Sequence, residues 1–226
     1  GGQDSKYIRI DQGVVVDFTM NEACAAGTGS FLEEQAEKLG IAIKGEFAKL
    51  ALASKQPARL GERCTVFMER DVTSLLLKGA EVGDLCAGLA YSVALNYLNR
   101  VVRGRKIGNC IFFQGGTAYN DAVAAAFSQI LGKRIVVPPH NGVIGAIGMA
   151  LIAREVMQQK GGQPSKFRGY HLDQVDFKTR EFSCKACSNL CDIKEFNIEG
   201  QRTYWGDKCS DKFRKRARTD RRPVIK

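Results

Sequence analysis

One run of the chain, residues 110–131, restricts the fold most strongly. It reads CIFFQGGTAYNDAVAAAFSQIL, a continuous apolar stretch, a glycine pair and then a helical apolar pattern. A continuous apolar run is typical of a strand buried on both faces. We therefore expect a strand at 110–114, a glycine turn and a helix at 118–131. A second β-rich run, RIVVPP, follows. This strand–helix alternation predicts an α/β layer with some parallel pairing.

The remaining patterns before residue 160 add a hairpin and several helices. KYIRI and VVVDFTM, joined by the turn signal DQG, predict a β-hairpin within the first twenty residues. Glycines at the ends of three apolar-periodic stretches are typical helix C-caps. We expect helices at 24–39, 46–54, 64–79 and 82–103, and another in NGVIGAIGMALIAREVMQQ.

The character of the sequence changes after KGGQPSK, residues 160–166. Hydrophobic periodicity stops there, and four clustered cysteines and a basic tail follow. We therefore predict one domain at 1–160, and a linker, a cysteine-rich module and a tail at 161–226. No apolar run approaches the roughly 18 residues of a membrane span, and no signal peptide is recognised. We expect a cytoplasmic protein that does not enter a membrane.

The formal net charge of +10 is concentrated in the tail KFRKRARTDRRPVIK. A basic tail can bind nucleic acid or an acidic partner, or it can be a solvated segment of a larger protein. No aromatic residue follows Phe213, so the tail lacks the stacking platform of a single-strand binder. We favour the solvated segment and do not expect nucleic acid as a partner.

Two glycine turns indicate nucleotide binding. Gly115 and Gly116 lie between a predicted strand and a predicted helix, where glycines let backbone amides approach a ligand and the helix N-terminus favours an anion. The stretch GGQDSK adds a second turn, in which Asp4 is placed to hold a metal-bound water or a phosphate. Neither turn is a Walker P-loop, because no GK[ST] follows.

Together the two turns resemble the second phosphate loop and the adenosine loop of the actin, sugar-kinase and chaperone ATPase superfamily. That resemblance implies two lobes with the nucleotide between them. Nothing in this sequence matches the first phosphate loop, which belongs to the N-terminal lobe. The resemblance therefore implies a C-terminal lobe of an actin-like ATPase fold, cut just inside its second phosphate loop, followed by a small cysteine-rich module.

Two lone cysteines each precede a predicted helix: Cys24 in NEACAAGTGSFLEE and Cys64 in GERCTVFMERD. A helix N-terminus stabilises a thiolate and makes it a better metal ligand. It also favours an iron–sulfur cluster, which carries net negative charge with four thiolates. Two cysteines are half of a tetrahedral set, so a two-fold dimer would supply the rest. We expect Cys24 and Cys64 close together on one exposed surface, and Cys86 and Cys110 in the core as small hydrophobes.

Three motifs identify a specific resemblance: NEACAAGTGSFLEEQAEKLG, ERCTVFMERDVTSLLLKG and FFQGGTAYNDAV. They resemble the ATP-dependent activators of 2-hydroxyacyl-CoA dehydratases and the ATPase subunits of benzoyl-CoA reductases, over residues 1 to about 157. The resemblance implies that Cys24 and Cys64 ligate one 4Fe-4S cluster that bridges a homodimer. It implies coupling of ATP hydrolysis to delivery of one low-potential electron to a partner acyl-CoA enzyme. The positions it assigns to ATP and Mg²⁺ are Gly1, Gly2, Gln3, Asp4, Gly115, Gly116 and Asn120.

The same resemblance indicates the kind of larger protein to which the chain belongs. Long fused activators carry a cysteine-rich segment after their ATPase part, so the chain resembles a fragment of such a form. In a parent with two ATPase units, the cluster would bridge those units.

A separate hypothesis concerns Gly27 and Gly29. They would bring the Cys24 loop close to the nucleotide's phosphates and couple the position of the cluster to the ATP state.

The late cysteines form a separate pattern: C-x2-C-x3-C, with a fourth cysteine eighteen residues later. So few apolar residues surround them that a metal is expected to hold the segment together. A C-x2-C knuckle with a distant fourth cysteine is typical of structural zinc, and three closely spaced cysteines also suit an iron–sulfur cluster. We favour zinc and expect the four thiols to converge on one tetrahedral site. They are Cys184, Cys187, Cys191 and Cys209.

Two other classes of function remain open at this point. A kinase-like small-molecule phosphotransferase of the same superfamily would have no cluster and would form a phosphorylated product. A non-enzymatic scaffold would hold zinc in its tail module and bind no nucleotide. His140, in a loop after VPP, is expected to be a surface or turn residue, and His171 stands alone.

Overall fold

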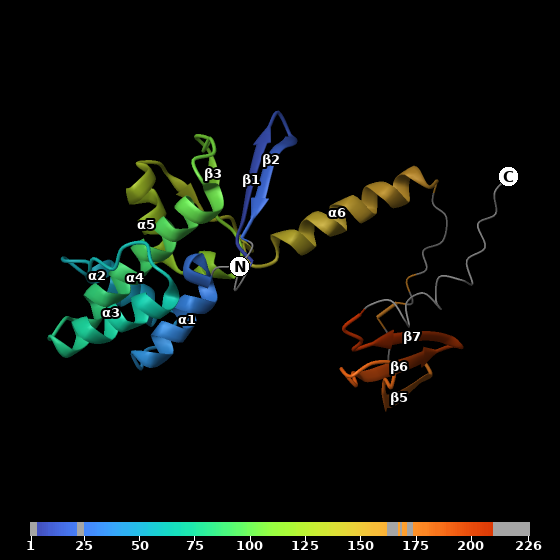
Figure 1. The fold of residues 1–226 in the computed structure, drawn as a ribbon. Coiled ribbons are helices and arrows are strands. Elements are labelled where there is room, and N and C mark those ends of the chain that lie inside the picture. Colours follow the sequence, from blue (N-terminus) through green and yellow to red (C-terminus); the bar gives the residue numbers. More distant parts are fainter. Residues whose placement is uncertain (1–3, 22–24, 162–166, 168, 171–173, 210–226) are drawn as a thin grey trace. The chain divides into compact units, whose positions relative to one another are not determined.

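The structure is a computed structural model that describes residues 4–21, 25–161, 167, 169, 170 and 174–209. The chain has a mixed α/β fold (Figure 1) and divides into two compact units, residues 1–159 and 160–226. Each unit is described by itself below. Among the described residues, no helix has both the length and the apolar character needed to span a bilayer.

The first unit begins with the predicted hairpin, formed by β1 (Lys6–Asp11) and β2 (Val14–Met20). The two strands are antiparallel, and Lys6 pairs with Met20. Gln12 and Gly13, in the DQG turn, both have positive φ (48° and 81°), as expected of the tight turns that match the twist of a hairpin.

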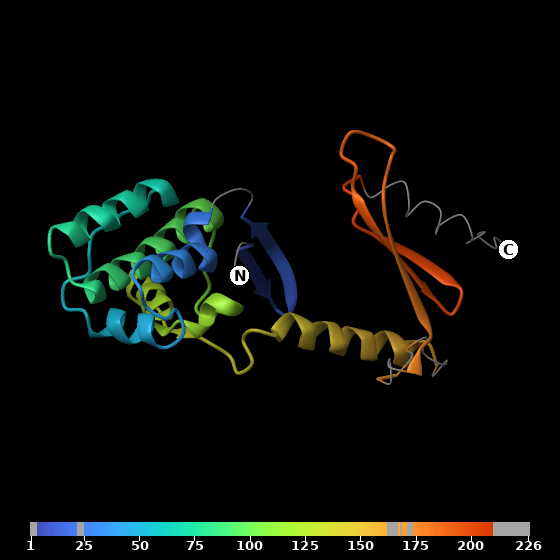
Figure 2. The same ribbon diagram turned by 90° about the horizontal axis from the view of Figure 1, so that it is seen from below.

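Helices make up most of the first unit, and those before α6 (Ile144–Gln159) lie close together (Figures 1 and 2). The prediction of a helix beginning at Cys24 is wrong in detail. Ala25–Gly27 form a 3-10 turn, closed by a 2.6 Å hydrogen bond from the Thr28 hydroxyl to the Ala25 carbonyl. Thr28 itself is extended (φ −126°) and occupies the N-cap position of the helix that starts at Gly29, without a capping hydrogen bond from its side chain. The other predicted helices are confirmed. The helices are α1 (Gly29–Lys38), α2 (Glu46–Ala53), α3 (Thr65–Leu77) and α4 (Val82–Tyr97).

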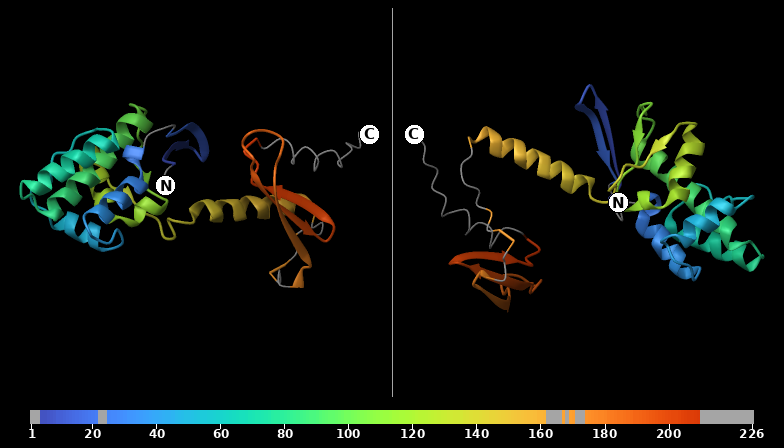
Figure 3. Two further views of the ribbon diagram at one scale, coloured as in Figure 1. Left: turned by 60° about the horizontal axis from the view of Figure 1, so that its bottom comes forward. Right: turned by 180° about the vertical axis from the view of Figure 1, so that it is seen from behind.

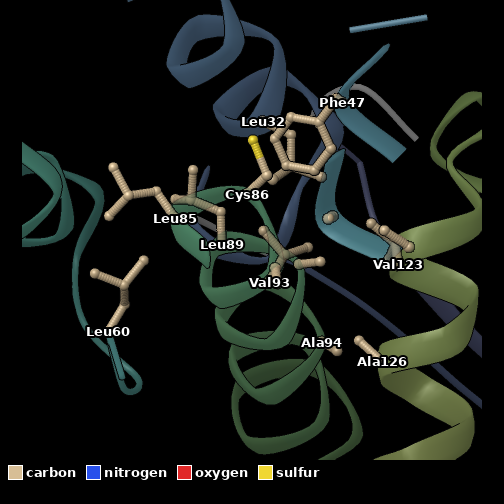
Figure 4. Close-up of a cluster of buried hydrophobic side chains, with 14 of the residues drawn as sticks. Leu32, Phe47, Leu60, Leu85, Cys86, Leu89, Val93, Ala94, Val123 and Ala126 are labelled. Atoms are coloured by element: carbon tan, nitrogen blue, oxygen red, sulfur yellow. The ribbon is translucent and has the colours of Figure 1, made fainter. Parts of the chain in front are cut away.

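The core of the first unit surrounds α4, which continues as a π-helical turn at Leu98–Val102. Figure 4 shows apolar side chains from neighbouring helices converging on Leu89 and Val93, which are 0% and 2% exposed. Each such side chain contributes roughly 1.5–3 kcal/mol through burial. Close packing also requires Gly88, because a Cβ there would lie within 3.0 Å of the Ala58 carbonyl.

The strand–turn–helix run is shorter than expected. β3 (Ile111–Phe112) pairs in parallel with β4 (Ile135–Val136), which confirms the predicted parallel pairing. The expectation of a strand buried on both faces is wrong, since Phe112 is 62% exposed. Among the described residues, β3 and β4 pair only with each other. The helix between them, α5, spans Asp121–Leu131. The last helix, α6, spans Ile144–Gln159 and has no buried side chain.

The second unit contains a three-stranded antiparallel sheet that the sequence patterns do not predict (Figure 3). Its strands are β5 (Phe177–Ser183), β6 (Asp192–Ile198) and β7 (Gln201–Trp205). Ile198 pairs with Gln201 across a two-residue turn in which Glu199 and Gly200 have positive φ. The signal for this hairpin is the dipeptide EG between two strand-like runs.

Candidate functional site

A cavity of about 720 Å³ lies in the first unit. Its walls come from the start of β1, the end of α4, the β3–α5 turn and the segment that enters α6. The lining residues used below are Asp4, Gly27, Tyr97, Gly115, Asn141 and Gly142. Two of the predicted nucleotide residues, Asp4 and Gly115, therefore share one cavity although they are far apart in sequence. Gly1, Gly2 and Gln3 lie outside the described residues.

The glycine turn is fixed by two hydrogen bonds to Asn141. The Gly115 amide donates to the Asn141 carbonyl at 2.8 Å, and the Asn141 side-chain amide donates to the Gly115 carbonyl at 3.0 Å. Gly115 has φ +99°, which a side chain rarely permits. Gly116 is exposed, and a Cβ there would meet nothing within 4 Å, but this residue is not among those that line the cavity. Asn141 was not among the predicted site residues; its only signal is the NG pair before a helix.

Asn120 has a structural role in this arrangement. Its Oδ1 accepts a 3.1 Å hydrogen bond from the Ala122 amide and caps α5. The residue is 7% exposed, and its side-chain Nδ2 is buried without a hydrogen-bond partner. Contact between Asn120 and a nucleotide stays a prediction.

The loop that carries the first predicted cluster ligand reaches the same cavity. Gly27 lines the cavity, and its carbonyl accepts a 3.0 Å hydrogen bond from the hydroxyl of Ser5 in the β1 entry. A Cβ at Gly27 would lie 3.0 Å from the backbone nitrogen of Tyr97, so α4 holds this loop from the other side. Cys24 lies outside the described residues. Its predicted distance to Cys64 therefore stays untested.

Tyr97 forms a neutral part of the cavity wall. Burial, and to a smaller extent the neighbouring Tyr7, raises the pKa of Tyr97 to about 12. Its hydroxyl donates a 2.9 Å hydrogen bond to the Lys6 carbonyl, which ties the end of α4 to β1. The hairpin, the cysteine loop and α4 are thus joined next to the cavity.

Cys64 stands where a helix-start ligand is expected. It immediately precedes α3, is exposed, and makes no capping hydrogen bond with its side chain. Because the unpaired amides of a helix N-terminus carry partial positive charge, they favour a thiolate or an anionic cluster there. Lys38 contacts Glu34 at 2.8 Å and Glu69 at 2.7 Å, so an exposed ion-pair network joins the last turn of α1 to α3.

The other lone cysteines differ from each other. Cys86 is fully buried, which confirms its predicted place in the core. Burial raises the pKa of its thiol to about 11, so it stays protonated and is a poor ligand. Cys110 was also predicted to be buried, but it is exposed. The reason is that β3 begins only at Ile111 and leaves Cys110 in the preceding loop. His140 is exposed at φ +57° in a turn, as predicted, and His171 is outside the described residues.

The late cysteines lie in two segments of the second unit. Cys184, Cys187 and Cys191 occupy the loop between β5 and β6, and Cys209 follows β7. In the described part of the chain, no three His, Cys, Asp or Glu residues are grouped so as to hold a metal ion. The convergence of these four thiols on one ion stays a prediction.

Comparison with known proteins identifies close relatives of the first unit. The BadF/BadG/BcrA/BcrD ATPase family matches residues 1–153. The chain is 37% identical over 161 residues to the activator of lactoyl-CoA dehydratase from Anaerotignum propionicum, covering 71% of this chain and 61% of the relative. It is 38% identical over 156 residues to the (R)-2-hydroxyglutaryl-CoA dehydratase activating ATPase of Acidaminococcus fermentans, covering 68% and 58%.

The structure is also similar to a solved activator. The activator of 2-hydroxyisocaproyl-CoA dehydratase from Clostridium difficile, with bound ADPNP, superposes with a TM-score of 0.66 at 29% identity. The superposition covers 74% of this chain and 62% of the activator. The chain thus spans about three fifths of the length of the proteins it matches.

Proposed function

Because the chain belongs to the BadF/BadG/BcrA/BcrD ATPase family, we propose that it is part of an ATP-coupled electron donor that activates an acyl-CoA dehydratase or reductase. The family predicted from the three sequence motifs is thereby confirmed. The observation that carries the proposal is one cavity that contains both Gly115, from the glycine turn, and Gly27, from the cysteine loop. We assign residues 1–160 to the C-terminal lobe of the ATPase.

The cavity has the properties that a nucleotide requires. Its volume of about 720 Å³ lies within the range of small-molecule sites. Gly115 adopts a backbone conformation that favours glycine, and the space beside Gly116 is open. Asp4 offers an exposed carboxylate for the water shell of Mg²⁺. The bound ADPNP of the similar C. difficile activator supports this assignment.

The cysteines fit a cluster shared by two ATPase units. Cys64 supplies an exposed thiol at a helix N-terminus, and Cys24 is the second ligand of the same chain. A 4Fe-4S cluster, when bound, supplies one electron at low potential. The α3 N-terminus then stabilises the negative charge held there.

The chain's own contacts suggest how nucleotide binding changes the position of Cys24. A ligand in the cavity touches the segment around Gly27, which Ser5 and Tyr97 hold from two sides. A shift of this segment moves the start of α1 and the residue three positions before Gly27, which is Cys24. We propose that this displacement changes the exposure of the shared cluster to the partner enzyme.

A comparison of two serine variants tests the proposal. The chain is prepared without oxygen, and iron, sulfide and visible absorption are measured for Cys64→Ser and for Cys110→Ser. Both cysteines are exposed, and serine is itself a good N-cap, so α3 should still form in the first variant. We expect a brown protein with iron from the parent sequence and from Cys110→Ser, and a colourless one from Cys64→Ser.

Three outcomes would contradict the proposal. Iron that persists in Cys64→Ser would remove this cysteine from the site. A colourless parent sequence that phosphorylates a small molecule would instead support the kinase-like phosphotransferase. A colourless parent without nucleotide affinity would support the non-enzymatic scaffold.

A further inference from the structure

The second unit has too little hydrophobic core to account for its sheet. Among its described residues, Ile193 is the one buried hydrophobic side chain. Phe177, Leu190 and Trp205 are 57%, 59% and 61% exposed. Ordering each residue of a strand costs roughly 1–2 kcal/mol of backbone entropy, and a single buried side chain returns only about 1.5–3 kcal/mol. The sheet therefore needs another source of stability.

Two of the four late cysteines are direct neighbours across the sheet. Ser183 pairs with Asp192 at the end of the β5–β6 ladder, and the Cys184 amide donates a 2.8 Å hydrogen bond to the Cys191 carbonyl just beyond it. Residues paired in this way have Cα atoms about 5 Å apart, and their side chains share one face of the sheet. That spacing lets both thiolates bind one ion.

The other two cysteines come to the same end of the sheet. Cys187 lies in the loop that Cys184 and Cys191 close, and its carbonyl accepts a 3.3 Å hydrogen bond from the Leu190 amide. At the end of β7, a Cβ on Gly206 would lie within 3.0 Å of the Asp192 carbonyl. Cys209 is three residues further on, a span of at most about 10 Å. The loop between β5 and β6 and the segment that follows β7 thus begin at the same end of the sheet.

We propose that Cys184, Cys187, Cys191 and Cys209 bind one Zn²⁺ ion in a closed tetrahedral site that stabilises the β5–β7 sheet. Four thiolates are a common set for structural zinc. Lys185 and Lys208, adjacent to two of the ligands, offset the two net negative charges of the filled site. Cys187 and Cys209 are exposed. Exposure to solvent does not alter the charge of a bound Zn²⁺ ion, because zinc has no redox chemistry.

The proposal is tested on the whole 226-residue chain. The chain is incubated with Zn²⁺ and desalted, and bound zinc is measured together with the alkylation of each cysteine by mass spectrometry. We expect one zinc per chain and protection of the four late cysteines, which a chelator reverses. Cys187→Ser and Cys209→Ser, from the two separate segments, should each lose zinc and expose the remaining three thiols. Cys110→Ser and Cys64→Ser are the controls and should retain both properties.

Three results would overturn the proposal. The first is iron with sulfide on these four thiols, which would make the module a second redox centre. The second is a chain without zinc in which all four cysteines alkylate freely. The third is a disulfide between Cys184 and Cys191 in place of the metal. None of these outcomes depends on the cluster at Cys64, because the Cys64→Ser control separates the two sites.

Discussion

Substitution of Gly88 by alanine tests the packing that positions the cysteine-bearing part of the first unit. The new Cβ would lie within 3.0 Å of the Ala58 carbonyl oxygen and at 3.0 Å from the Ala58 Cβ. A backbone oxygen cannot rotate away, so either α4 or the loop around Ala58 must move. That movement would disturb the 2.9 Å hydrogen bond from the Ala58 amide to the Asp84 carbonyl.

The expected magnitude follows from two opposing effects. Alanine is about 1 kcal/mol better than glycine inside a helix, whereas overpacking a tight contact costs typically 1–3 kcal/mol and occasionally more. The clash is with the backbone, so we take the upper part of that range, about 2–3 kcal/mol, and expect a net loss of about 1–2 kcal/mol. For a unit of this size, that loss lowers Tm by roughly 2–8 °C.

The measurement is thermal and urea unfolding of the 226-residue chain, followed by far-ultraviolet circular dichroism. Gly148→Ala in α6 is the matched control, because a Cβ there meets nothing within 4 Å, and it should leave Tm unchanged or slightly higher. A Gly88→Ala variant as stable as the parent would show that α4 does not pack against Ala58 as described.

Two further predictions concern the capping of α5 and the buried thiol. Asn120→Ala should lower the free energy of unfolding by about 1 kcal/mol because α5 loses its cap. Asn120→Asp should not lower it, since aspartate keeps the cap oxygen and removes the unpartnered amide. Equal losses of both variants in urea unfolding would contradict this role of Asn120. The folded-state pKa of Cys86 is raised from 9.0 to about 11, so between these pH values the unfolded chain loses a proton that the folded chain keeps. Urea unfolding should therefore show stability falling across this interval, less steeply in Cys86→Ala, and an unchanged slope would refute the assignment.

Local signals predicted the elements whose geometry depends on neighbouring residues. The DQG turn identified the first hairpin because Gln12 and Gly13 adopt the left-handed backbone that such turns need. Cys64 was placed correctly before a helix. The start of α1 was missed because Ala25–Gly27 form a 3-10 turn, which the Thr28 hydroxyl closes, and the α-helix begins only at Gly29.

Features that depend on distant contacts could not be read from the sequence. The cavity is closed by the pairing of Gly115 with Asn141, 26 positions apart, and no local pattern predicts that contact. The β5–β7 sheet was missed because FKTREFS is polar on both faces, so it lacks the one-sided apolar alternation of a half-buried strand. Exposure of Cys110 likewise depends on where β3 begins, at Ile111, which leaves Cys110 in the preceding loop.

The hydrogen bond from Ser5 to Gly27 has a thermodynamic consequence for the proposed activator. Gly27 belongs to the loop that carries Cys24 and also to the cavity wall, so the two proposed sites share one segment. Coupling through a shared segment is reciprocal: if ATP binding changes the cluster's reduction free energy, reduction must change ATP affinity by the same amount. Couplings of this kind are typically about 1–3 kcal/mol. A reduced activator should then differ from an oxidised one in how tightly it holds nucleotide, and the loss of the Ser5 hydroxyl should weaken both directions equally.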